Sequence, residues 1–234
     1  MHCSSYAFRE GERTMRLARL VVLVVGVLTG VLAPVAARAV PSNVFVFGDS
    51  LSDTGTLAEA WGHNAPNPPS FHDSFTNGPV AVELLAERFG LRADPSLWLT
   101  SFTDAFHLFP SGFVAGTNYA VGGATAAGGT TGLPNQVGAF LSHLGQHAPS
   151  DALYLVMIGG NDVRTAAHAA NSAGVVAGVN SELAMIQLLI SKGATHILIP
   201  NVPIVGAIPE FRLGCPRWPV GVCSVRTLDV MNPV

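Results

Sequence analysis

Three short apolar runs, each ending at a turn residue, recur along the chain. They are residues 44–47, 152–158 and 196–199, and they end at Gly48, Gly159-Gly160 and Pro200. Runs that are apolar throughout are typical of strands buried on both faces of a sheet. Helical spacing follows in residues 79–89, 136–144 and 172–191, with Pro79 and Pro134 at helix starts and Gly90 and Gly193 at helix ends. The alternation predicts an α/β fold, a parallel sheet covered by helices on both faces.

Polar and glycine residues directly follow two of the predicted strands. Ligands of such sheets bind at the carboxyl ends of the strands, so we expect chemistry at residues 48–50 and 159–162. Ser50 is the first candidate, because a serine there is exposed at the sheet edge. A serine hydroxyl needs a base and oxyanion donors to act as a nucleophile. By position alone, an N-cap of the following helix is the favoured interpretation of Ser50.

Composition narrows the class of protein. Of the 234 residues, 49% are apolar and 12% are charged, and the net charge is −3. This provides a large core for one domain and argues against nucleic-acid binding, which calls for a basic surface. No repeat or linker divides the chain after residue 39.

The N-terminus has the three-part pattern of a secretory signal peptide. Residues 20–35 are apolar and uncharged, Arg16 and Arg19 precede them, and Ala37-Arg38-Ala39 follows. We predict cleavage after Ala39, a signal segment at 1–39 and a catalytic domain at 40–234 in a secreted or periplasmic protein. Met15 directly precedes the basic flank and is a second possible start. A retained anchor is the alternative, although the run is shorter than the ~20 residues of a membrane span, and we expect no span after cleavage.

Two cysteines remain after residue 39. Cys215 and Cys223 lie in a segment rich in proline and glycine, and in an exported protein this spacing favours a local disulfide over two free thiols. A zinc site is disfavoured, because no CxxC or paired-histidine spacing accompanies them. We expect no metal and no cofactor.

Three ordered blocks resemble the GDSL (SGNH) hydrolases. VFGDSLSDTG at 46–55, GTNYAVGGAT at 116–125 and IGGNDV at 158–163 are similar to the first three blocks of that family. FTNGPVAVELLA and LPNQVGAFL, between them, resemble its secreted bacterial branch of phospholipase-like and lecithinase-like proteins. The resemblance implies the flavodoxin-like, three-layer SGNH fold and a serine hydrolase of lipid or short acyl esters. It outweighs the N-cap interpretation of Ser50.

The resemblance also implies roles for single residues. Ser50 would be the nucleophile, and the oxyanion would be held by the backbone N–H groups of Ser50 and Gly123 and by the side-chain amide of Asn161. Asp49, Asp53 and Asp162 accompany these blocks and are interpreted as residues that order turns and loops.

The family's fourth element, an Asp-x-x-His pair near the C-terminus, is not found after Cys223. Asp104 and His107 form the one such string, in the wrong order for the family, and the remaining histidines are interpreted as loop, helix-surface or strand-start residues. We therefore expect the last strand and helix of the fold to be missing and these 234 residues to hydrolyse esters poorly. A fragment, a truncated reading frame and a degenerate copy all fit, and the alternative function is a non-catalytic remnant that binds acyl or glycan ligands. Neither the particular ester nor the oligomeric state follows from the sequence.

Overall fold

The sheet of the protein has three parallel strands in the order β1-β2-β3. The computed structural model describes residues 40–62, 66, 70–99, 116–208 and 211. The strands are β1 (Val44–Gly48), β2 (Leu153–Met157) and β3 (His196–Leu198). Residues 117–121 run parallel to β1: the Val46 N–H donates to the carbonyl of Thr117 at 3.0 Å, and the Tyr119 N–H donates to the carbonyl of Val46 at 2.8 Å.

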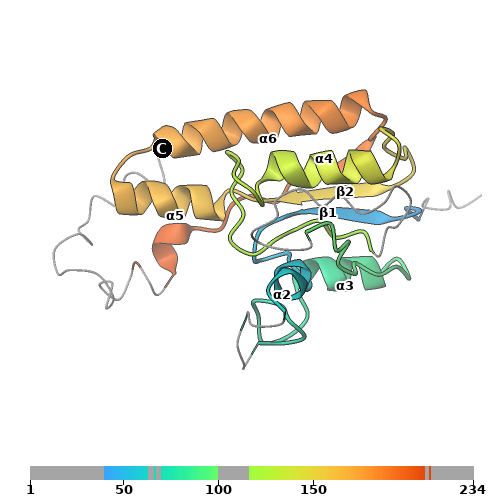
Figure 1. Cartoon of the computed structure of the whole chain (residues 1–234), viewed down its shortest axis with the longest axis horizontal. Helices are drawn as coiled ribbons and strands as arrows, with labels where there is room; N and C mark the ends of the chain where they lie inside the picture. The colour runs from blue at the N-terminus through green and yellow to red at the C-terminus, as the bar shows by residue number, and fades with distance from the viewer. Residues whose placement is uncertain (1–39, 63–65, 67–69, 100–115, 209–210, 212–234) are drawn as a thin grey trace, which may run out of the picture. The chain divides into compact units, whose positions relative to one another are not determined.

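Helices cover both faces of this sheet, as the apolar strands predict. Figure 1 shows α4 and α6 on one face and α2 and α3 on the other. The helices are α2 (Thr56–Ala60), α3 (Ala81–Glu87), α4 (Leu133–His143), α5 (Gly160–Ala169) and α6 (Ala173–Ser191), and a 3-10 turn, η1, covers Val205–Ala207. The α/β class with a parallel sheet is therefore confirmed.

Alternate side chains of β1 fill two separate cores. Phe45 and Phe47 meet Phe140 of α4 edge-to-face, with ring centroids 4.8 and 5.4 Å apart. Val44 and Val46 lie in the opposite core, which includes Val82 and Ala86 of α3. Edge-to-face pairs add stability beyond the area they bury. The strand that leads to Ser50 is thus packed on both sides and forms a rigid base for it.

The third strand departs from expectation. β3 forms where a strand is predicted, but its residues are exposed or half-buried, and Leu198 is 42% exposed. The prediction that it is buried is wrong for the described residues, because β3 is the outer strand there and only β2 pairs with it. Apolarity alone does not distinguish an outer strand from a central one.

The long helix α6 is rich in apolar residues. An 18-residue window has a mean hydropathy of 1.6, so within the described residues this helix is long and apolar enough to cross a membrane by composition. It contacts α4 and α5, and Gly178 and Leu189 are buried there. These contacts identify α6 as a layer of the α/β domain. Several of its large side chains remain exposed, namely Val176, Val179, Leu183 and Ile190.

Candidate active site

Three segments reach the carboxyl end of the sheet at the same level. Gly48, the last residue of β1, is paired with Met157 of β2, and its carbonyl accepts the N–H of Val121 at 3.2 Å. Ser50 and Gly123 each lie two residues beyond this row, and Asn161 lies four residues beyond it. The fold therefore brings the three residues predicted for catalysis to one edge of the sheet.

Ser50 lies in a tight turn that leaves its side chain partly exposed. The N–H groups of Ser52 and Asp53 both donate to the carbonyl of Asp49 at 3.0 Å, and the Leu51 N–H donates to Asp49 Oδ1 at 3.0 Å. Helix α2 starts only at Thr56. The N-cap interpretation of Ser50 is thus wrong.

Asp53 takes the capping role instead. Its carboxylate accepts the N–H groups of Gly55, Thr56 and Leu57, at 2.9, 2.7 and 3.2 Å. The same carboxylate accepts the N–H of Gly122 at 2.7 Å, which joins the first sequence block to the second. Burial raises the pKa of Asp53, while these four N–H donors oppose that rise. The interpretation of Asp53 as an ordering residue is confirmed.

Gly123 occupies the exposed turn of the loop between Gly122 and Ala127. Its φ is +81°, a region that favours glycine, and a Cβ there would find no atom within 4 Å. Gly122 is closed in by contrast, because a Cβ there would lie 2.4 Å from the Phe75 ring. The loop therefore needs both glycines, one for its conformation and one for its close packing.

Asn161 and Asp162, in the first turn of α5, hold the other end of this loop. Asn161 Nδ2 donates to the carbonyl of Ala124 at 2.8 Å. Asp162 Oδ2 and Oδ1 accept the N–H groups of Ala126 and Ala127, at 2.8 and 3.0 Å. An amide nitrogen carries two hydrogens, so Asn161 has a second donor besides the one that Ala124 uses. The ordering role predicted for Asp162 is confirmed.

Gln136 holds the end of β1 in place, a role that the sequence does not predict. This fully buried side chain of α4 accepts the Gly48 N–H through Oε1 and donates through Nε2 to the Gly48 carbonyl, both at 2.8 Å. Nε2 also donates to the carbonyl of Thr131 at 2.8 Å. An amide inside an otherwise apolar helix face is the signal that marks such a residue.

Asn118 has a similar unassigned role within the second block. Its Nδ2 donates to the carbonyl of Ser52 at 2.6 Å, and its Oδ1 accepts the N–H of Ala120 at 2.9 Å. It thereby joins the segment beside β1 to the turn that carries Ser50.

The charge of Asp162 acts on two other carboxyl groups. Burial raises the pKa of Asp49, and the charge of Asp162 adds to the rise. Burial, again with the charge of Asp162, also raises the pKa of Glu182 on α6. Within the described residues no group of three His, Cys, Asp or Glu side chains is placed to hold a metal ion.

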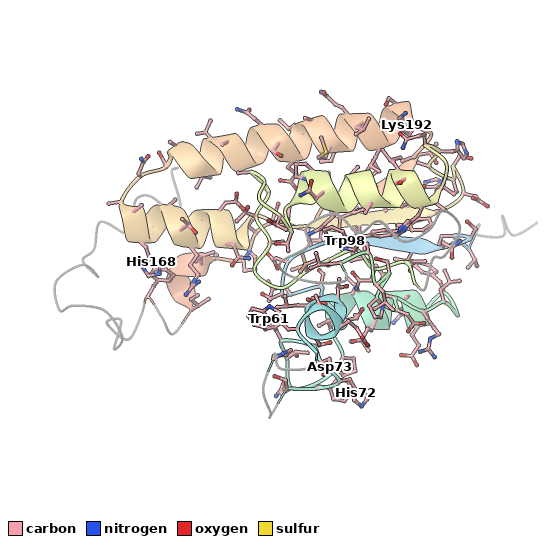
Figure 2. All side chains as sticks on the ribbon, viewed as in Figure 1. Trp61, His72, Asp73, Trp98, His168 and Lys192 are labelled. Atoms are coloured by element: carbon pink, nitrogen blue, oxygen red, sulfur yellow. The ribbon has the colours of Figure 1, made fainter. Side chains whose placement is uncertain are left out.

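No hydrogen bond joins a histidine to Ser50 in the described part of the chain. His143 Nδ1 lies 3.0 Å from Tyr119 Oη, and burial lowers the pKa of His143. This histidine is half-buried in α4 rather than on a helix surface, which corrects the interpretation of the sequence. His168 lies near the end of α5 away from the sheet (Figure 2), with its ring centroid 5.2 Å from that of Phe211. Trp98, also labelled there, is buried and donates Nε1–H to the Tyr119 carbonyl at 2.9 Å.

Several predicted features lie outside the described residues. They are the signal segment at 1–39, the Asp104 and His107 pair, and the Cys215 and Cys223 bridge. Cleavage after Ala39 and the disulfide stay predictions.

Comparison with known proteins decides the family. The model of the GDSL-like lipase/acylhydrolases matches residues 44–229. The chain belongs to this family. Membership implies the SGNH hydrolase α/β fold, in agreement with the parallel sheet and its helices.

Relatives of this GDSL chain occur in bacteria and plants. It is 29% identical over 176 residues to Lipase 1 of Photorhabdus luminescens, covering 72% of this chain and 23% of that protein. It is 29% identical over 197 residues to a GDSL esterase/lipase of Arabidopsis thaliana, covering 74% of this chain and 53% of the relative. A GDSL lipase of Tanacetum cinerariifolium is 27% identical over 236 residues, covering 89% and 60%. The chain thus spans less than two thirds of the length of each relative.

Proposed function

We propose that this protein hydrolyses carboxylic esters through Ser50, with Gly123 and Asn161 as oxyanion donors. The observation that carries the proposal is that Gly48, Val121 and Met157 are paired at the carboxyl end of the sheet. Ser50 and Gly123 come two residues after this row, and Asn161 comes four residues after it. The family's name for these proteins, lipase/acylhydrolase, supports the reaction class.

In this proposal the Ser50 hydroxyl oxygen attacks the ester carbonyl and its proton passes to a base. Negative charge then develops on the former carbonyl oxygen, where the N–H groups of Ser50 and Gly123 and the second amide hydrogen of Asn161 stabilise it. Collapse expels the alcohol and leaves an acyl-serine, which water hydrolyses to the acid. The base is not assigned among the described histidines, and His107 lies outside them.

The substrate class we propose is a lipid or short acyl ester, on the strength of the family and of relatives named lipases. Export through the segment at 1–39 is proposed from the sequence pattern alone.

The test is the initial rate of p-nitrophenyl acetate hydrolysis by the full chain and by two serine variants. Ser50→Ala should abolish the hydrolysis that exceeds the buffer rate. Ser52→Ala is the matched control, because Ser52 lies in the same turn, is fully buried, and has an Oγ with no partner among the described residues. Equal rates for the parent and Ser50→Ala would contradict the proposed nucleophile.

A further inference from the structure

A cavity of about 260 Å³ lies beside the proposed oxyanion site. Its lining comes from the loop after Gly123, from one face of α5 and from the start of α6. The lining residues used below are Thr125, Ala127, Asp162, Ala166, Ala169 and Asn171. Asp162, Ala166 and Ala169 follow one another at helical spacing, so a single stripe of α5 forms one wall.

Three of the polar side chains that line this cavity already make hydrogen bonds within the protein. Thr125 Oγ1 donates to the carbonyl of Gly128 at 2.6 Å, and Asn171 Oδ1 accepts the N–H of Ala173 at 2.9 Å. Both oxygens of Asp162 accept loop N–H groups, as described above. Besides the Thr165 hydroxyl and the Asn171 amide nitrogen, the lining offers a ligand mainly the methyl groups of alanine and threonine, so the cavity favours an apolar group.

The cavity begins one or two residues from the oxyanion donors. Asp162 follows Asn161 directly, and Thr125 is two residues from Gly123. The Ala124 carbonyl between them accepts the Asn161 amide at 2.8 Å, which keeps the two walls together. An apolar space therefore lies next to the two segments that carry the donors.

We infer that this cavity binds a linear alkyl chain of the ester substrate and thereby sets its length preference. The inference rests on the proposed function, because it places the ester at Ser50. The volume of about 260 Å³ lies just below the usual range of ligand pockets, about 300–1,000 Å³, which suits a short chain. The chain comes from the acyl or the alcohol side of the ester, and the experiment separates the two.

The binding test uses the Ser50→Ala variant, which holds ester without turning it over, with ¹³C-methyl-labelled alanine. Ethyl hexanoate and hexyl acetate carry the alkyl chain on the acyl and the alcohol side. One of the two esters should shift the methyl resonances of Ala127, Ala166 and Ala169. Ala184, exposed on α6 and outside the lining, should stay unchanged. Unchanged resonances of the three lining alanines with both esters would overturn the inference, even if the protein lacks activity.

In the kinetic test, a larger side chain at the exposed position 169 fills the cavity. Ala169→Leu should lower kcat/KM for p-nitrophenyl hexanoate about tenfold more than for p-nitrophenyl acetate, the usual effect of a methylene or two in an apolar pocket. Ala184→Leu is the control and should leave both rates as in the parent. An unchanged hexanoate-to-acetate ratio in Ala169→Leu, with acetate hydrolysis still dependent on Ser50, would refute an acyl-side chain while leaving the proposed function intact. Absence of Ser50-dependent hydrolysis in the parent would refute the proposed function, and the resonances would still decide the cavity.

Discussion

The link between Gln136 and Gly48 carries a quantitative prediction about the strand end below Ser50. Gln136→Leu keeps the side chain close in size and removes all three hydrogen bonds. The Gly48 carbonyl keeps the N–H of Val121, and Thr131 is a partly exposed residue. The buried Gly48 N–H alone is left without an acceptor. A buried donor left unpaired costs about 1–3 kcal/mol, so the free energy of unfolding should fall by about that amount.

Urea denaturation, followed by circular dichroism, measures this loss. Gln187→Leu is the matched control: it makes the same substitution at an exposed position of α6 and should change stability by no more than about 0.5 kcal/mol. Because Gly48 lies two residues before Ser50, Gln136→Leu should also slow ester hydrolysis where Gln187→Leu does not. Equal unfolding midpoints for the two variants would refute the account of Gln136 as the support of the strand end.

Three further predictions concern Asp162, Glu182 and His107. Asp162→Ala leaves the buried Ala126 N–H without its acceptor, so the free energy of unfolding should fall by about 1–3 kcal/mol in the same urea assay. The control Asp151→Ala, at an exposed position, should change it little. The rate of ester hydrolysis by Asp162→Ala should fall by at most the 10²–10³-fold typical of a lost oxyanion donor. The raised pKa of Glu182 means that the folded chain binds a proton more tightly than the unfolded chain, so stability falls as the pH rises above about 4.3. Glu182→Gln should therefore melt at a higher temperature than the parent at pH 7, and the difference should vanish below about pH 4; a lower melting temperature at pH 7 would contradict this sign. His107→Ala should leave any Ser50-dependent rate unchanged, because Asp104 and His107 stand in the wrong order for the family. Loss of that rate would instead assign His107 as the base.

The sequence predicts the strands well because their signal is local. The apolar runs at 44–47 and 152–158 stop at glycines, and β1 and β2 end within a residue or two of those points. The sequence does not predict helix α5, because its first residues, Gly160 and Asn161, favour turns. Only the contacts of Asp162 with the loop of residues 122–127 reveal why a helix starts there. The exposure of β3 depends on which strands lie beside it, and apolarity carries no information about that.

In the candidate site, too, the sequence predicts the residues with a local signal and not those with distant partners. Ser50, Gly123 and Asn161 could be proposed from resemblance, since each lies in a short block of sequence. The residues that hold them in place could not, because their partners are distant in the chain: Gln136 is 88 residues from Gly48, and Asn118 is 66 residues from Ser52. Such pairs become visible only when the fold brings the segments together.

The most direct test of the central claim, that Ser50 is the nucleophile, is mass spectrometry of the full chain after reaction with an alkyl fluorophosphonate. This reagent phosphonylates an activated serine and releases fluoride. The account predicts one adduct, on the peptide that contains Ser50, which is lost in Ser50→Ala and kept in Ser52→Ala. An adduct that persists in Ser50→Ala, or a parent chain that stays unmodified, would contradict it.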